Sequence, residues 1–138
     1  MASNASRYLF LFLLGLLVGA IATVMAVRAL QARQDPFPHA VMNVMGKHAG
    51  LLGQKVAQNR CAATDTVPHA RALRTMANDL ETAFPELADD QRFTTHSSQF
   101  RAHLDAALSA PPTDCAAAGA LNEQIKESCK ACHQDFRG

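Results

Sequence analysis

The chain has 138 residues, a net charge of +1 from 13 Lys and Arg against 12 Asp and Glu, and four cysteines. Such a balanced charge gives no electrostatic basis for binding nucleic acid. An uncharged apolar run from Tyr8 to Val27 leaves roughly 108 residues for the rest of the chain, which is enough for one soluble domain and no more.

The apolar run is long enough to cross a bilayer, because a helix over Tyr8–Val27 would span about 30 Å. A cleaved signal peptide is the alternative, with Arg7 before the run and Ala20-Ile21-Ala22 as a small-residue cleavage site. Apolar residues continue beyond Ala22, which favours an uncleaved anchor. The segment therefore predicts a single crossing of the membrane through residues 8–27.

Four stretches of the remaining chain repeat apolar residues every three or four positions, as amphipathic helices do. No window alternates at every second residue, so no sheet is expected. The expected helices run from near Asp35-Pro36 to Asn59-Arg60, from Thr66 to Phe84, from Asp89-Asp90 to Pro111, and from Thr113-Asp114 to Phe136. Short loops between them predict an all-α fold: an antiparallel up-down-up-down four-helix bundle preceded by one N-terminal transmembrane helix. The chain then divides into a signal anchor (1–30), a short linker (31–35) and the bundle (36–138).

The last expected helix carries Cys129-Lys130-Ala131-Cys132-His133, the spacing by which haem is attached covalently in c-type cytochromes. At 100° per residue, Cys129 and His133 lie about 40° apart, with Cys132 about 60° to the other side. Thioether bonds from both cysteines would hold the porphyrin edge, and His133 would reach the iron as the proximal ligand. The motif predicts one covalently bound haem c.

Three other interpretations of the motif stay open. A thioredoxin-type redox pair is expected in a strand–helix context, which is absent. A zinc site would need partners for the two thiols, yet Cys61 and Cys115 are isolated. A chance match is the third. Bacteria attach haem covalently outside the cytoplasm, so the haem interpretation predicts a periplasmic domain on the inner membrane, or a soluble periplasmic protein if the N-terminal segment is cleaved.

The two ends of the domain resemble the cytochrome c-prime family, the class II c-type cytochromes. The resemblance rests on residues 129–137 (CKACHQDFR) and 41–50 (VMNVMGKHAG), and it covers about residues 36–138. It implies a four-helix bundle with haem attached near the C-terminus, a distal haem position at Met42, and an Arg beside the proximal face at Arg137. The usual family member is a soluble dimer, so the resemblance also implies a homodimer, whereas the membrane span departs from the family.

The other two cysteines give a register that does not depend on the family. In an up-down-up-down bundle, the loops after the first and third helices lie at the same end, so Cys61 and Cys115 are expected to meet. An oxidising compartment would let them form a disulfide, and two unpaired buried thiols are the alternative. His133 lies 18 residues beyond Cys115, which is about 27 Å along the helix. The same distance back from Cys61 ends at Asn43, so its neighbours Met42 and Met45 are expected at the level of the haem.

A methionine at the level of the haem can have two roles, and both stay open for Met42. Its sulfur would complete a six-coordinate, low-spin electron carrier, or it would only pack over the ring and leave a five-coordinate iron open to small gases. His39 is an alternative ligand. Arg137 would neutralise a haem propionate or flank the proximal pocket, and a solvated terminal Arg is the alternative there.

The sequence therefore predicts a non-enzymatic, membrane-anchored monohaem cytochrome that carries single electrons. Its partner would be a membrane or periplasmic redox protein, because the linker from Gln31 to Asp35 reaches at most roughly 17 Å and keeps the haem near the membrane. A second function class is a five-coordinate haem that binds nitric oxide or carbon monoxide for sensing, storage or protection. A third is a purely structural tethered bundle.

Overall fold

The computed structural model of the chain describes residues 4–31 and 35–136. The chain divides into two compact units, Met1–Pro36 and Phe37–Gly138. Most of the expected linker at 31–35 lies outside the described residues, and so does Arg137.

The first unit contains one long helix, α1 (Asn4–Gln31). Its segment Ser6–Gln31 has a mean hydropathy of 2.6 and, among the described residues, is the one helix long and apolar enough to cross a membrane. Apolar residues occupy all sides of it, which is typical of a helix surrounded by lipid rather than water. A membrane anchor and an N-terminal signal sequence share these features.

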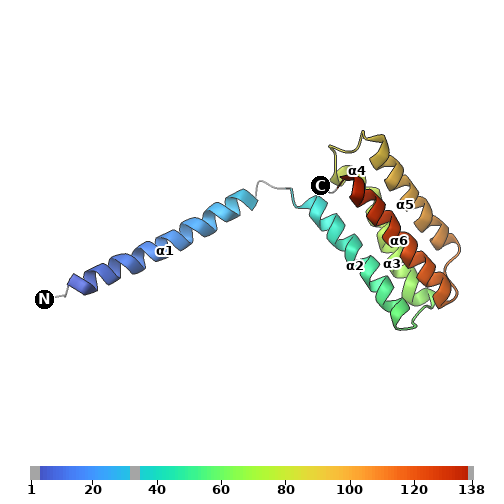
Figure 1. Cartoon of the computed structure of the whole chain (residues 1–138), viewed down its shortest axis with the longest axis horizontal. Helices are drawn as coiled ribbons and strands as arrows, with labels where there is room; N and C mark the ends of the chain where they lie inside the picture. Colours follow the sequence, from blue (N-terminus) through green and yellow to red (C-terminus); the bar gives the residue numbers. More distant parts are fainter. Residues whose placement is uncertain (1–3, 32–34, 137–138) are drawn as a thin grey trace. The chain divides into compact units, whose positions relative to one another are not determined.

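The second unit is a bundle of four antiparallel helices: α2 (Phe37–Ala57), α3 (Ala63–Met76), α5 (Gln91–Ser109) and α6 (Cys115–Phe136). Around the bundle the order is α2, α3, α5, α6, and α6 packs back against α2 (Figure 1). The described parts of the chain contain no strand. This arrangement confirms the all-α, up-down-up-down bundle preceded by one N-terminal apolar helix.

Two aspartates begin helices where the sequence predicts helix starts. The Asp90 carboxylate accepts a hydrogen bond from the Arg92 backbone N–H at 2.8 Å, and Asp114 accepts one from the Ala117 N–H at 2.8 Å. Each satisfies an amide that has no partner within the first helical turn. At the other end of α2, Asn59 reverses the chain in the left-handed conformation, with φ of 56°, which Asn tolerates better than most residues.

The second expected helix differs from the prediction. It begins earlier, at Ala63, and a 3-10 turn, η1 (Ala77–Asp79), separates it from the short α4 (Leu80–Ala83). Arg101 of α5 accounts for the break, because its Nη1 donates to the Ala77 carbonyl at 2.9 Å and its guanidinium also binds Glu81 at 2.8 and 3.0 Å. A carbonyl that accepts from a side chain no longer needs the helical N–H.

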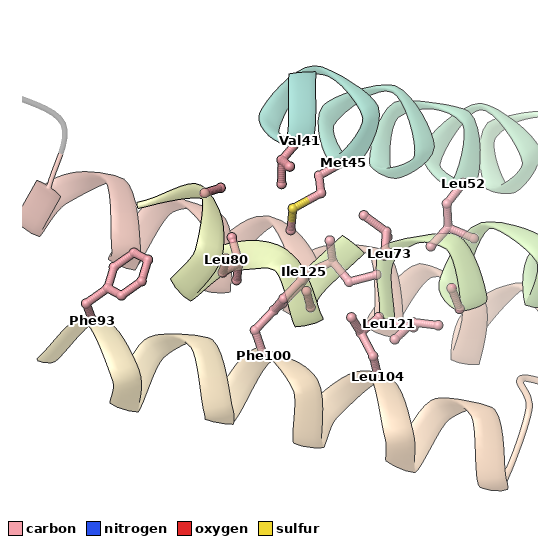
Figure 2. Packing of buried hydrophobic residues seen from close by; sticks show 13 residues of the cluster. Val41, Met45, Leu52, Leu73, Leu80, Phe93, Phe100, Leu104, Leu121 and Ile125 are labelled. Atoms are coloured by element: carbon pink, nitrogen blue, oxygen red, sulfur yellow. The ribbon is translucent and has the colours of Figure 1, made fainter. Parts of the chain in front are cut away.

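The interior of the bundle is filled by apolar side chains from all four helices. Figure 2 shows Val41 and Met45 pointing inward from α2, while Phe93, Phe100 and Leu104 point inward from α5. The largest side chains without exposed surface include Leu52, Leu73, Leu104 and Ile125.

A disulfide closes one end of the bundle. It joins Cys61, after α2, to Cys115 at the start of α6, with the two Cα atoms 5.0 Å apart, inside the range that disulfides occupy. The pairing is the one that the bundle topology predicts. It leaves the beginning of α2 and the end of α6 together at the opposite end of the bundle (Figure 1).

Candidate haem site

The Cys-x-x-Cys-His motif lies in the last two turns of α6, on an uninterrupted helix. Cys129 and Cys132 are half-buried and pack against the apolar core, whereas His133 is exposed. This end of the bundle therefore presents two thiols toward the interior and one imidazole toward solvent.

Both thiols are held in their protonated form. Burial raises the pKa of Cys129, and the pKa of Cys132 is raised by burial first and then by Cys129 and Asp135. Reactive redox cysteines have lowered pKa values in electropositive surroundings. The surroundings of this pair have the opposite effect, which argues against a thioredoxin-type redox centre.

The donor set also argues against zinc. Among the described residues, no group of three or more His, Cys, Asp or Glu side chains is placed to hold a metal ion. Cys61 and Cys115 are bonded to each other at the opposite end of the bundle, so they cannot complete a four-ligand site with Cys129 and Cys132. Two neighbouring thiols and one imidazole match the attachment chemistry of a c-type haem.

Close contacts between α2 and α6 set the register of the two helices. A Cβ placed on Gly53 would lie 3.3 Å from Asn122 Nδ2, and a Cβ placed on Gly119 would lie 3.8 Å from Val56 Cγ1. Because the helices are antiparallel, each step back along α2 corresponds to one step forward along α6. Counting from Gly53, which faces Asn122, therefore places position 42 level with position 133.

The side chains of α2 at that level are the two methionines that the sequence singled out. Met42 is half-buried and packs against the core, and Met45, one turn further along α2, is 7% exposed. His39, the alternative ligand, is exposed. Of these three side chains, Met42 is the one that lies level with His133 and also packs at the edge of the core.

A groove of about 390 Å³ runs between α2 and α6. Its α2 wall consists mainly of small residues, and its α6 wall contains Asn122 and Lys126; the small residues are Ala49, Gly50, Gly53 and Ala57. Met42 lies seven residues before Ala49, and His133 lies seven residues after Lys126, so each lies within about 20° of the groove-lining face of its helix. The groove itself ends at Ala49 and Lys126, before the motif. The residues that fit a haem are Cys129, Cys132 and His133 on α6, with Met42 of α2 level with His133.

The last turn of α6 packs against the first turns of α5. The Phe136 ring packs edge-on against Phe93, with centroids 5.5 Å apart, and Arg92 lies over it at 5.2 Å. His96 Nε2 and Asp135 Oδ2 are 3.0 Å apart. These contacts hold the end of α6 that follows His133 against α5.

Two buried polar residues were not singled out as site residues by the sequence. Ser97 and Asn122 are 2% and 4% exposed, and Ser97 Oγ and Asn122 Oδ1 have no hydrogen-bond partner. Ser97 falls on the three-four apolar repeat of its helix, between Phe93 and Phe100. A polar residue at such a position is the signal that could have marked it.

Among known proteins, the chain is similar to a cytochrome c′. No family model matches the chain, and no solved structure matches it. A curated protein named cytochrome c′, from Rhodospirillum rubrum, is 25% identical over an alignment of 142 positions that covers 88% of this chain and 96% of the relative. The chain is thus similar to a cytochrome c′ over most of its length.

Proposed function

We propose that this protein is a c-type cytochrome in which Cys129 and Cys132 hold one haem covalently and His133 ligates its iron. The observation that carries the proposal is the placement of the motif. Its two half-buried thiols lie on α6 one turn before His133 and directly beside it, and the α2–α6 register places Met42 level with His133. The similarity to a cytochrome c′ supports the same assignment. A bound haem would supply a one-electron redox centre.

The proposal is tested by a visible spectrum of the full chain matured with a haem-attachment system. The expected result is a haem c spectrum that remains with the polypeptide in denaturant. The matched control is the double variant Cys129→Ala/Cys132→Ala, which should fold but carry no covalent haem. A colourless wild-type chain would refute the proposal.

The leading function is single-electron transfer, with Met42 as the sixth iron ligand. If the Met42 thioether bound the iron, it would give a low-spin centre with a raised reduction potential. The position of Met42 at the edge of the core, level with His133, supports this role. Met42→Ala should convert a low-spin ferric spectrum to a high-spin one. Met45→Ala, the matched control, should keep the low-spin spectrum while costing about 2–5 kcal/mol of stability.

The second candidate function is the binding of a small gas at an iron without a sixth protein ligand. The observation that favours it is the Ser97 hydroxyl, which is buried in the bundle without a partner. A wild-type ferric spectrum that is already high-spin, and that Met42→Ala leaves unchanged, would favour this function over electron transfer.

We also propose that α1 anchors the protein in the inner membrane with the haem domain in the periplasm, near a membrane oxidoreductase. The apolar length of α1 supports an anchor, and the Cys61–Cys115 disulfide supports an oxidising compartment. The anchored protein should remain with washed membranes and keep its N-terminal segment. It should also be reduced faster than a chain truncated before Phe37 at equal surface concentration. A mature N-terminus near Ala22 would show instead that the segment is cleaved.

A further inference from the structure

We infer that the Ser97 hydroxyl lines the haem pocket and donates a hydrogen bond to a small polar ligand bound to the iron, such as a diatomic gas. The inference rests on the proposed haem attachment and deepens the second candidate function. Its basis is the burial of Ser97, its level in the bundle, and the side of the haem that it would face.

Ser97 lies in the core with an unused hydrogen-bonding group. Its side chain is 2% exposed, and Oγ has no partner. Hydroxyl residues in helices commonly donate to the carbonyl four residues earlier. Thr66 does so to Ala62 at 3.2 Å, and Ser109 does so to Asp105 at 2.8 Å. An unpaired buried hydroxyl lowers stability, so a ligand that accepts from it would remove that cost.

Contacts between α5 and α6 place Ser97 at the level of the motif. His96 contacts Asp135 at 3.0 Å, and His103 contacts Ser128 at 3.3 Å. Because the helices are antiparallel, these two contacts put Ser97 level with the residue that follows His133. The α2–α6 register puts Met42 at the same level, so Ser97, His133 and Met42 lie in one layer of the bundle.

Within this layer, Ser97 is on the interior side. It lies on the same face of α5 as Phe93 and Phe100, which point into the core (Figure 2). Cys129 and Cys132 pack against that core, while His133 is exposed. A ring held by the two thioethers would have His133 on its outer side and the core on its other side. Ser97 therefore belongs to the side where an added ligand would bind.

Asn122, the other buried residue with an unpaired polar atom in the described part of the chain, is not placed for this role. It lies eleven residues before His133, which is about 16 Å along α6. Its amide faces Gly53 of α2, at 3.3 Å from the position of a Cβ there. Of the two, Ser97 alone is in the layer of the motif.

The test uses the haem-loaded full chain in detergent, reduced and exposed to carbon monoxide, in wild-type and Met42→Ala backgrounds. Ser97→Ala should raise the carbon monoxide stretching frequency and speed its dissociation by about three- to tenfold, the loss expected for one hydrogen bond. Thr66→Val is the matched control, since it removes a buried hydroxyl near the disulfide end of the bundle and should leave the frequency and the rate unchanged.

Two results would overturn the inference. In one, Ser97→Ala has the same frequency and dissociation rate as its parent. In another, carbon monoxide fails to bind in both backgrounds. Neither result would contradict the proposed covalent attachment of haem to Cys129 and Cys132. A wild-type chain without covalent haem would instead refute the proposed function, and this inference with it.

Discussion

Removing the disulfide should cost the bundle a large part of its stability. Cys61 and Cys115 are separated by 54 positions, so the cross-link removes the closure entropy of a long loop from the unfolded chain. In the chain-entropy model this contributes about 4 kcal/mol at 25 °C. For a bundle of about 100 residues, each kcal/mol shifts the melting temperature by roughly 4–8 °C. The double variant Cys61→Ala/Cys115→Ala should therefore melt roughly 15–30 °C below the wild type.

The assay is thermal unfolding of the full chain in mild detergent, followed by circular dichroism at 222 nm. The wild type is measured with and without a thiol reductant, and the double-alanine variant serves as the matched control for the reduced state. Reduced wild type and double variant should melt together, well below the oxidised protein. Melting temperatures within a few degrees for all three samples would refute the chain-entropy account of this cross-link.

Three further predictions concern the helix seams. Gly50→Ala should raise stability in urea unfolding by roughly 0.5–1 kcal/mol, since nothing lies within 4 Å of the added Cβ; a lowered stability would contradict the open space at this position. Burial first, and then His48, lowers the pKa of His69, so the unfolded chain binds the proton more readily and stability should fall as the pH drops below about 6.5. His69→Gln should lessen the decrease in melting temperature between pH 7.5 and 5, and an unchanged decrease would exclude His69 as its source. Arg101→Leu should cost about 1–3 kcal/mol in urea unfolding, because it leaves the η1 carbonyl and a carboxylate without their partner; a loss below a few tenths would contradict that role.

The features that the sequence predicted well are those set by local chemistry. Helix starts after Asp90 and Asp114 follow from side chains that cap amides only two or three residues away. The four-helix count follows from the three-four spacing of apolar residues, which each helix needs in order to bury one face. Neither depends on knowing which helices are neighbours.

The candidate site needed topology as well as local pattern. In an up-down-up-down bundle, the expected pairing of Cys61 with Cys115 fixes the register of the two helices and puts His133 opposite Asn43. The α2–α6 contacts through Gly53 and Gly119 put it opposite Met42, one residue away. The two registers agree closely because both helices are unbroken and rise by the same amount per residue.

The features that the sequence could not predict arise from distant residues. The break at η1 depends on Arg101, which lies 24 positions beyond the carbonyl it binds. Most helical serines donate to a nearby backbone carbonyl. The absence of a partner for the Ser97 hydroxyl is therefore visible only in the folded core. Periodicity gave Ser97 a place on the buried face but no partner and no role.

Covalent attachment of haem is measured most directly by the intact mass of the mature chain after acid–acetone extraction. We expect a polypeptide heavier by one haem, and this added mass should be lost in Cys129→Ala/Cys132→Ala. A wild-type mass equal to that of the bare polypeptide, with all colour in the extract, would contradict covalent attachment.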